Sequence, residues 1–432
     1  MASRIVINCW GSHGDVLPYV GLAKAIAARG HAPVVAAPET YRRIVEQEGI
    51  EFVAVGPDVA QMDPATFARA MHPAKGSEFI VREMILPHLR RTYDELRDAA
   101  RGADLIVSHP ITYAAPVLAE REGLPWVSTV LAPMFFFSLT DLPAVPAAPW
   151  LVHAGKLGPS VARAIVGLIR RASRPWMLPV ERLRADLGLP PGRHPMFEGL
   201  FSPFLTLALF SKVLAEPQPD WPPNVAVTGF SFYNGRDGLP PELEEFLASG
   251  PPPVVFTLGT SAVGAAGRFY HESVAAAARL GVRAVLLTGG FERNRPAGAL
   301  PRDVLVTDRA PHALLFPRAS AIVHHGGIGT TGQALRSGQP MLVVPHSHDQ
   351  PDNALRVRRL GVACTLPARR YRAPRVAREL ERLLDGSYRA RAEAVAAVVR
   401  SEGGADAAAV AVERLLAAER RLHGADAAPA LT

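Results

Sequence analysis

The stretch His324-His325-Gly326-Gly327-Ile328-Gly329-Thr330-Thr331 follows an apolar run, Ala321 to Val323, and precedes a segment with a helical pattern. An apolar strand that ends in a glycine-rich turn before a helix lets backbone N–H groups and the helix N-terminus face an anion. The two histidines add hydrogen-bond donors for phosphate oxygens. The stretch therefore predicts a phosphate-binding turn.

A second apolar run, Met341 to Val344, leads into Pro345-His346-Ser347-His348-Asp349-Gln350 and then Asn353. This places a carboxylate and an amide one strand–loop step after the glycine turn. Such a pairing suits a ligand with phosphate at one end and hydroxyls at the other. A nucleotide-sugar has this chemistry.

Composition limits the possible classes of protein. The chain has 432 residues, 48% hydrophobic and 20% charged, which is too long for one ordinary core and predicts two domains. The net charge is +7, but no basic motif interleaved with aromatic residues predicts nucleic acid as a partner. Cys9 and Cys364 cannot build a disulfide framework, and no long apolar segment follows the N-terminus, so we expect a cytoplasmic protein.

Short apolar runs alternate with helical patterns in both halves of the chain. The predicted strands are Ile5–Cys9, Ala32–Ala37, Ile50–Val55, Leu105–Val107, Trp126–Val130, Val254–Leu258, Ala284–Thr288, Val304–Val306, Ala321–Val323, Met341–Val344 and Val362–Leu366. This alternation predicts an α/β protein with two doubly wound, Rossmann-like domains that face each other across a cleft. Prolines and glycines mark residues 216–240 as the linker between domains 1–215 and 241–404.

The pattern loosens between residues 131 and 210. Met134-Phe135-Phe136-Phe137 and several prolines precede a basic, apolar stretch at 150–184. No run of 18 apolar residues occurs there, so a membrane-spanning helix is not predicted. The stretch is compatible with a cover over an apolar pocket, with peripheral contact at the inner face of a membrane, or with helices whose arginines lie at the rim.

The residues of both halves resemble glycosyltransferase family 1. Gly11-Ser12-His13-Gly14-Asp15-Val16-Leu17-Pro18-Tyr19-Val20 resembles the opening of that family, and the block from Ala310-Pro311-His312 to Asp349-Gln350 and Asn353-Ala354 resembles its nucleotide-sugar signature. The members most similar in pattern are bacterial and fungal enzymes that glycosylate lipids, sterols or polyketides, including rhamnolipid-forming rhamnosyltransferases. The resemblance covers nearly the whole chain.

The resemblance implies a GT-B fold, inverting chemistry without a required metal, and a C-terminal helix, 405–421, that packs back onto the N-terminal domain. That domain would bind the acceptor and the second domain would bind a UDP- or dTDP-sugar, such as UDP-glucose or dTDP-rhamnose. Asp349 and Gln350 fall on the pair that grips sugar hydroxyls, and His324 falls on the histidine that contacts the diphosphate. The predicted donor-binding residues are Thr260, Ser261, Arg309, His312, His324, His325, Gly327, Gly329, Thr330, Gln333, Asp349 and Gln350.

The chain departs from the plant pattern of the family at two donor positions. Arg309 stands where plant members place a tryptophan on the base, and a guanidinium can also stack on a base plane. Gln333 stands near the place of a glutamate that binds the ribose. His325 could instead point into the interdomain surface.

Asp15 is the predicted general base. It stands where many members carry histidine in Gly-His-x-x-Pro, and some bacterial members use aspartate there. An aspartate with an ordinary pKa near 4 cannot deprotonate a free alcohol, but it can accept the proton as the new bond forms. The alternative is that Asp15 only caps the helix near Pro18. His13 lies two residues earlier and is not predicted to be the base.

The predicted acceptor-binding residues are His13, His109, Met134, Phe135 and Phe136. We therefore predict transfer of a hexose to the hydroxyl of an apolar small molecule or lipid by a monomer or homodimer. The alternatives are a nucleotide-sugar epimerase of the same fold, a non-catalytic nucleotide-binding protein, and a metal hydrolase built on His346, His348 and Asp349. The histidines lie on separate loops and no H-E-x-x-H pattern occurs, so no metal site is predicted.

Overall fold

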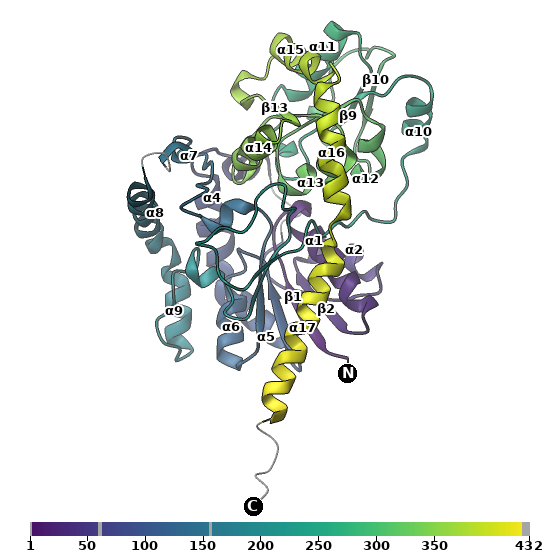
Figure 1. Ribbon diagram of the computed structural model, residues 1–432. Coiled ribbons are helices and arrows are strands. Elements are labelled where there is room, and N and C mark those ends of the chain that lie inside the picture. Colours follow the sequence, from purple (N-terminus) through teal and green to yellow (C-terminus); the bar gives the residue numbers. More distant parts are fainter. Residues whose placement is uncertain (1, 59–62, 155–157, 426–432) are drawn as a thin grey trace, which may run out of the picture.

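The chain folds into two lobes, each built on a parallel sheet with helices on both faces (Figure 1). The computed structural model describes residues 2–58, 63–154 and 158–425. The α/β class and the two doubly wound sheets predicted from the sequence are confirmed.

The first sheet has the strand order β3-β2-β1-β4-β5-β6-β7. Its strands are β1 (Arg4–Asn8), β2 (Ala32–Ala37), β3 (Glu51–Ala54), β4 (Leu105–Ser108), β5 (Trp126–Val130), β6 (Leu205–Ala208) and β7 (Val225–Val227). The helices of this lobe are α1 (His13–Ala28), α2 (Arg42–Glu46), α3 (Pro64–Ala70), α4 (Gly76–Phe79), α5 (Leu89–Ala99), α6 (Ala114–Glu122), α7 (Leu151–Ala154), α8 (Pro159–Ser173) and α9 (Leu178–Asp186). The strand order reverses between β1 and β4, and ligands of such sheets bind outside this point.

The strands of the first sheet are apolar throughout because both faces are covered. Along β1, Ile5 and Ile7 pack into one hydrophobic cluster, while Val6 packs into another on the opposite face. Helix α1 covers the first face, and α5, α6 and α9 contribute to the second. The first cluster continues into the second lobe, where it includes Val255 and Ile322.

The second sheet has the order β10-β9-β8-β11-β12-β13 and reverses between β8 and β11. Its strands are β8 (Val254–Thr257), β9 (Ala284–Leu287), β10 (Val304–Thr307), β11 (Ala321–His324), β12 (Met341–Val343) and β13 (Ala363–Thr365). The helices of this part of the chain are α10 (Pro241–Ala248), α11 (Phe269–Leu280), α12 (His312–Leu315), α13 (Ile328–Ser337), α14 (Gln350–Arg359), α15 (Ala373–Leu383), α16 (Ser387–Ser401) and α17 (Gly404–Ala425).

Two strands correct the sequence prediction. β6 lies in the range 131–210, where the pattern predicted irregular structure, and β7 lies inside the predicted linker 216–240. The first sheet therefore extends to Val227, and the linker predicted at 216–240 includes the last strand of that sheet. β7 has three half-buried residues between a pair of prolines and Gly229, so the local proline and glycine content outweighed a weak strand signal.

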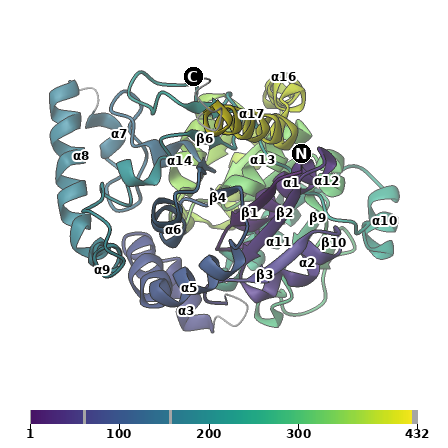
Figure 2. The ribbon, with the colours of Figure 1, turned by 90° about the horizontal axis from the view of Figure 1, so that it is seen from below.

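The C-terminal helices connect the lobes. Helix α16 packs against α13 of the second lobe, and α17 packs against α1 of the first (Figures 1 and 2). An ion pair between Arg29 and Glu413 joins α1 and α17. The predicted return helix at 405–421 thus begins at Gly404 and reaches Ala425.

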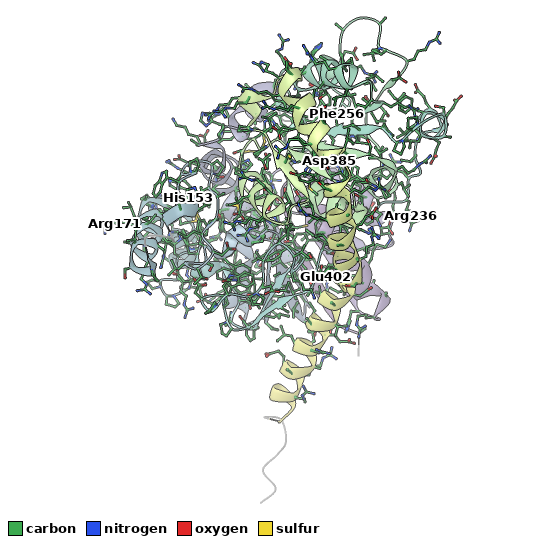
Figure 3. The ribbon with its side chains drawn as sticks, turned by 45° about the horizontal axis from the view of Figure 1, so that its top comes forward. His153, Arg171, Arg236, Phe256, Asp385 and Glu402 are labelled. Atoms are coloured by element: carbon green, nitrogen blue, oxygen red, sulfur yellow. The ribbon has the colours of Figure 1, made fainter. Side chains whose placement is uncertain are left out.

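Helices α7, α8 and α9 form one outer edge of the first lobe (Figures 1 and 2). Figure 3 shows His153 and Arg171 at that edge. None of the helices in the described ranges is both long and apolar enough to cross a lipid bilayer. Cys9 and Cys364 are buried and free.

A buried arginine joins the two lobes. Arg356 on α14 donates to Asp352 on its own helix at 2.7 Å and to Asp141 of the first lobe at 2.6 Å. Asp352 also accepts a bond from the backbone N–H of Ala144 at 3.0 Å. The loop that follows β5 is therefore fastened to α14 by charged groups that are withdrawn from water.

Replacing Arg356 with alanine should destabilise the protein strongly. The Asp352 side chain is 1% exposed, and removal of its partner would leave a buried, unpaired carboxylate. We expect a loss of about 3–5 kcal/mol in the free energy of unfolding, measured by denaturant titration.

Arg359 provides the matched control, because it contacts the same Asp141 from a side chain that is 52% exposed. Arg359→Ala should cost only about 0–1 kcal/mol. Equal losses in the two variants would contradict the role given to the buried pair.

Candidate active site

Three helices begin where the lobes meet. α1, α13 and α14 follow the C-terminal ends of β1, β11 and β12, so their N-termini lie at the facing sheet edges. A Cβ built on Gly329 of α13 would lie 3.4 Å from the Cα of Gly14 in α1, which is van der Waals contact. Each N-terminus offers unpaired N–H groups and partial positive charge, so the seam between the lobes favours anions.

Asp15 lies in the first turn of α1. Its Oδ2 accepts bonds from the backbone N–H and the hydroxyl of Ser12, both at 2.8 Å. Asp15 therefore does cap the helix, as the alternative interpretation of the sequence held. Its side chain remains 38% exposed. Capping thus occupies one carboxylate oxygen and leaves Oδ1.

Oδ1 of Asp15 faces His109, which follows β4. The distance from His109 Nε2 to Oδ1 is 3.9 Å, and the histidine side chain is 3% exposed. His109 Nδ1 accepts the backbone N–H of Ile111 at 3.2 Å, so in the neutral ring the proton sits on Nε2, toward Asp15. Burial opposes ionisation of Asp15, but the nearby ring of His109 and the hydrogen bonds from Ser12 outweigh burial and hold the pKa of Asp15 below its ordinary value.

The structure corrects the role expected for His324. Its ring is fully buried, with Nδ1 accepting the N–H of Gly326 at 3.1 Å and Nε2 lying 3.4 Å from the sulfur of Met341. Burial lowers the pKa of His324 to about 3, so the ring is neutral. With both nitrogens facing protein groups, His324 braces the glycine turn and is not placed to contact a diphosphate.

His325 lies between two glycine loops. A Cβ on Gly259 would come within 2.5 Å of the His325 ring, and a Cβ on Gly327 within 2.3 Å. Only glycine at both positions leaves room for this ring. His325 is 3% exposed, and among the described residues its Nδ1 has no hydrogen-bond partner. A buried ring nitrogen without a partner can receive a ligand at low cost.

Asn353 joins the glycine turn to the loop after β12. Its amide donates to the carbonyl of Gly326 at 2.9 Å and to Asp349 Oδ2 at 2.7 Å. Gln350 uses its Oε1 to accept the backbone N–H groups of His346 and Ser347 at 2.8 and 3.1 Å. Gln350, one of the two residues predicted to bind sugar hydroxyls, thus uses its side-chain oxygen within the loop. Its amide nitrogen is left to donate to a ligand.

Asp349 has an environment unlike that of Asp15. Burial and the negative charge of Asp15 raise the pKa of Asp349 to about 7. Burial lowers the pKa of His348, and the charge of Asp15 opposes that shift. Helix α1, which carries Asp15, packs against α13, and α13 packs against α14, which follows the loop at 345–350.

Sequence analysis missed the first-lobe residues that touch this loop. Ser77 on α4 lies with its hydroxyl 3.0 Å from Nδ1 of His348, and the Ser347 hydroxyl donates to the carbonyl of His72 at 3.2 Å. His348 adopts a backbone φ of +56°, an uncommon value for a residue with a side chain. No local pattern marks Ser77 or His72, because their partners lie far away in sequence.

The other predicted donor residues divide into two groups. Half-buried Thr260 and Ser261 follow Gly259, which packs against His325, and Thr330 is buried in the first turn of α13. Burial and then the charge of exposed Arg309 lower the pKa of His13 in the first lobe. His312 stacks on Phe316 with ring centroids 4.3 Å apart, and burial lowers the pKa of His312 to about 4. Gln333 is directed elsewhere, since its amide donates to Asn234 of the interlobe connection at 3.2 Å.

The predicted acceptor residues include both partly exposed residues and a residue of the core. His13 is half-buried beside Tyr41, with ring centroids 5.4 Å apart, and Met134 and Phe135 are partly exposed. Phe136 is a core residue instead: it is 8% exposed and stacks on Trp221 with ring centroids 3.9 Å apart. A run of aromatics after a strand does not by itself distinguish pocket from core.

Two further observations bound the site. In residues 2–58, 63–154 and 158–425, no group of three or more His, Cys, Asp or Glu side chains is arranged to hold a metal ion.

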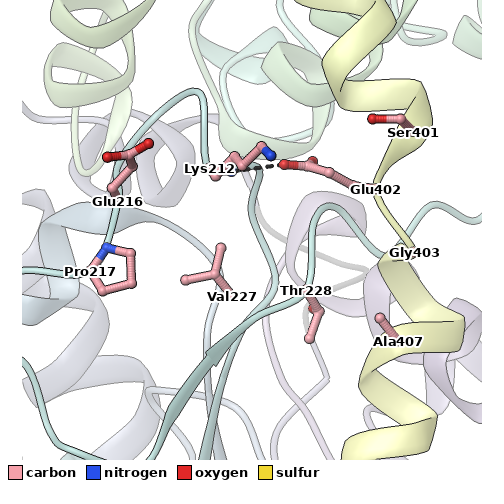
Figure 4. Close-up of a pocket in the computed structure, with 9 residues that line it drawn as sticks. All are labelled: Lys212, Glu216, Pro217, Val227, Thr228, Ser401, Glu402, Gly403 and Ala407. Atoms are coloured by element: carbon pink, nitrogen blue, oxygen red, sulfur yellow. Dashed lines mark hydrogen bonds between the residues drawn. The ribbon is translucent and has the colours of Figure 1, made fainter.

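A pocket of about 520 Å³ lies away from the seam residues described above, at the junction between α16 and α17 (Figure 4). Its lining residues are Lys212, Glu216, Pro217, Val227, Thr228, Ser401, Glu402, Gly403 and Ala407.

The chain is similar to known proteins over nearly its whole length. Residues 273–414 match the family described as Erythromycin biosynthesis protein CIII-like, C-terminal domain. The O-mycaminosyltylonolide 6-deoxyallosyltransferase of Streptomyces fradiae is 35% identical over 426 residues, which cover 95% of this chain and 97% of that protein. The sterol 3-beta-glucosyltransferase of Neurospora crassa is 30% identical over 450 residues, covering 97% of this chain but 28% of that larger protein.

The fold matches solved structures as well. The glycosyltransferase VinC in complex with DTDP superposes with a TM-score of 0.67 at 22% identity, covering 96% of this chain and 100% of that one. This likeness shows a shared two-domain fold.

Replacing Asp349 with asparagine should change how stability depends on pH. The pKa of Asp349 is raised from 3.8 to about 7 in the folded protein, so its contribution to stability is full below pH 3.8 and is lost as the pH rises through 7. The Asp349→Asn variant has no carboxyl group at this position, so it does not lose this stability as the pH rises. We expect the variant to melt above the wild type by about 2 °C or more at pH 8, with a smaller difference at pH 5.

The Asp15→Asn background tests the origin of the effect. Without the charge of Asp15, the pKa of Asp349 should fall. The difference in melting temperature caused by Asp349→Asn should then stop growing at a lower pH than it does when Asp15 is present. A difference in melting temperature that stays constant from pH 5 to pH 8 would show that Asp349 does not titrate in this range.

Proposed function

Because this chain belongs to the glycosyltransferase family that includes the 6-deoxyallosyltransferase of Streptomyces fradiae, we propose that it transfers a hexose from a nucleotide-sugar to the hydroxyl of an apolar acceptor, with inversion at the anomeric carbon. Membership favours transfer over the epimerase, hydrolase and non-catalytic alternatives. The acceptor class is proposed from the relatives, whose names refer to O-mycaminosyltylonolide and to sterols, and from half-buried Met134 and Phe135, which follow β5.

In the proposed reaction Asp15 Oδ1 accepts the proton of the acceptor hydroxyl. The acceptor oxygen forms its bond to the anomeric carbon from the face opposite the diphosphate. The bond from that carbon to the diphosphate oxygen breaks, and its electron pair leaves with the nucleoside diphosphate. His109 keeps Oδ1 oriented through its Nε2 proton. Asp15 returns the proton to water after the product leaves.

The second lobe stabilises the leaving group in this proposal. His325, the amides of the glycine turn and the N-terminus of α13 lie where negative charge develops, and preorganised donors are often the largest catalytic contribution. Asp349 and the amide nitrogen of Gln350 hold the sugar hydroxyls. Arg309 stacks on the base, and Thr260, Ser261, Thr330 and His312 complete the donor site.

The observation that carries the proposal is the opposition of two carboxylates across one seam. Asp15 lies in the first turn of α1 in the first lobe, and Asp349 is the N-cap of α14 in the second. Both helices pack against α13, whose Gly329 approaches Gly14 of α1. A proton acceptor from one lobe and a sugar-binding carboxylate from the other meet the geometric needs of glycosyl transfer. The same two groups would have no shared task in a protein that only binds nucleotide.

We propose a dTDP-sugar as the donor, with a UDP-sugar as the alternative. The solved neighbour with DTDP supports this choice by analogy of fold. We also propose that transfer needs no metal, that the protein is cytoplasmic, and that it acts as a monomer or homodimer. Activity that survives a chelator, with product formed from dTDP-sugars in a donor screen, is the expected result. Activity that a chelator removes and a divalent cation restores would contradict the proposal.

Asp15→Asn should reduce the turnover number by about 10²–10⁴-fold, since the amide cannot accept the proton. The amide oxygen can still accept from Ser12, so the helix cap and the fold should survive. Affinity for the nucleoside diphosphate, measured by calorimetry, should stay within about twofold. Turnover above about a tenth of the wild-type value would remove Asp15 from this role.

His325→Gln and His324→Gln should separate the two adjacent histidines. We expect His325→Gln to weaken binding of dTDP by about tenfold, because a donor to the diphosphate is lost. His324→Gln should leave the affinity within about threefold and instead lower the melting temperature, because a buried ring is replaced. A greater loss of affinity in the His324 variant would assign the contact to His324.

A further inference from the structure

The outer edge of the first lobe carries a surface that the transfer reaction does not use. α8 runs along this edge between α7 and α9 (Figures 1 and 2). In Figure 3 Arg171 of α8 reaches outward, away from both sheets. Neither Asp15 nor the donor loops contact this helix in the bonds described above.

Exposed large apolar side chains gather at this edge. Six such residues occur among the described residues, and four lie between positions 150 and 178: Trp150, Val161, Leu168 and Leu178. Leu168 is 67% exposed and Trp150 is 57% exposed. Single exposed apolar residues are ordinary, but a group of them on one edge marks an interaction site.

The apolar residues of α8 fall on two sides of the helix. Ala162 and Val166 are buried in a small cluster with Leu151 and Phe197. Val161 and Leu168 are seven residues apart, so they share the outward side with exposed Ala164 and Ala172. The inward side is covered by its own lobe, while the outward apolar strip is uncovered in the part of the chain that the structure describes.

Basic residues lie beside the apolar strip. By helical spacing, Arg171 borders the strip, Arg163 lies further round the helix toward its buried side, and Arg174 follows as the C-cap. Arg174 reaches Glu181, whereas Arg163 and Arg171 have no ion pair within the described residues. The sequence has no aspartate or glutamate from position 142 to position 180, so α8 itself carries only basic charge. Acidic partners reach it from outside this range, since Glu198 pairs with Arg170 as Glu181 does with Arg174.

We propose that the outward side of α8, together with exposed Trp150 just before α7 and Leu178 at the start of α9, docks on the surface of an anionic phospholipid membrane. A helix with an apolar strip, a tryptophan and adjacent arginines is suited to lie in the headgroup region, where the apolar side chains enter and the guanidinium groups stay at the phosphates. The excess of positive charge on α8 complements an anionic leaflet.

The membrane is favoured over an acidic protein partner by the shape and chemistry of the face. The strip is narrow, two of its four members are alanine, and it lies on an outer edge of the molecule (Figure 2). A bilayer needs no matching shape to accept Leu168 and Trp150, whereas a protein partner needs a complementary surface. Docking here would hold the enzyme where apolar molecules concentrate.

The test is co-sedimentation of the full chain with vesicles. We expect binding to vesicles of phosphatidylglycerol and phosphatidylcholine, weak binding to pure phosphatidylcholine, and a several-fold loss when the salt concentration is raised to 0.5 M, about where screening becomes strong. Leu168→Glu and Arg171→Glu should each weaken binding to the anionic vesicles by at least about fivefold.

Leu314→Glu is the matched control, because Leu314 is 46% exposed on α12 of the other lobe. This variant should bind vesicles like the wild type. Leu168→Glu should keep wild-type transfer to a water-soluble acceptor, which separates a docking defect from misfolding and from failure of the proposed reaction. Absence of binding to anionic vesicles, equal losses in Leu168→Glu and Leu314→Glu, or binding only to an acidic protein would overturn the proposal.

Discussion

The meeting of three helix N-termini at one seam constrains the rest of this structure. α1, α13 and α14 each follow a strand near the reversal point of its sheet, so topology brings their positive ends together. Contact between Gly14 and Gly329 keeps them close. A site of this kind favours negative charge.

Two carboxyl groups lie at these helix N-termini, and their pKa values are shifted in opposite directions. Asp15 receives bonds from Ser12 and lies beside His109, and its pKa is held below the ordinary value although burial opposes this. Asp349 receives one side-chain bond, from Asn353, and faces the charge of Asp15, so its pKa rises to about 7. Neighbouring carboxyl groups whose pKa values are separated by their surroundings are typical of sites with distinct acid and base tasks.

The strands of this fold could be predicted because doubly covered parallel strands are apolar throughout. β2 and β5 have the bounds that the sequence predicts. The orientation of the two adjacent histidines could not be predicted, because successive side chains at a strand end point to opposite faces and a shift of one residue exchanges them. His324 therefore turned inward and His325 toward the glycine loops. The predictions for Phe136 and for the β7 segment were wrong for a related reason. Phe136 is buried against Trp221, which is distant in sequence, and β7 pairs with β6, and neither contact leaves a local signal in the sequence.

The buried ionic contact of Arg356 links the two halves of the proposed chemistry. Asp141 follows Met134 and Phe135 on the loop after β5, and Arg356 lies on α14, whose N-cap is Asp349. α14 has ten residues, so we expect a shift of this loop to be transmitted along it to Asp349, the proposed sugar-binding carboxylate. Misplacement of reacting groups by about 1 Å can cost about 10²-fold in rate. The buried contact between Arg356 and Asp141 therefore helps to hold the proposed acceptor side and the proposed donor side in register.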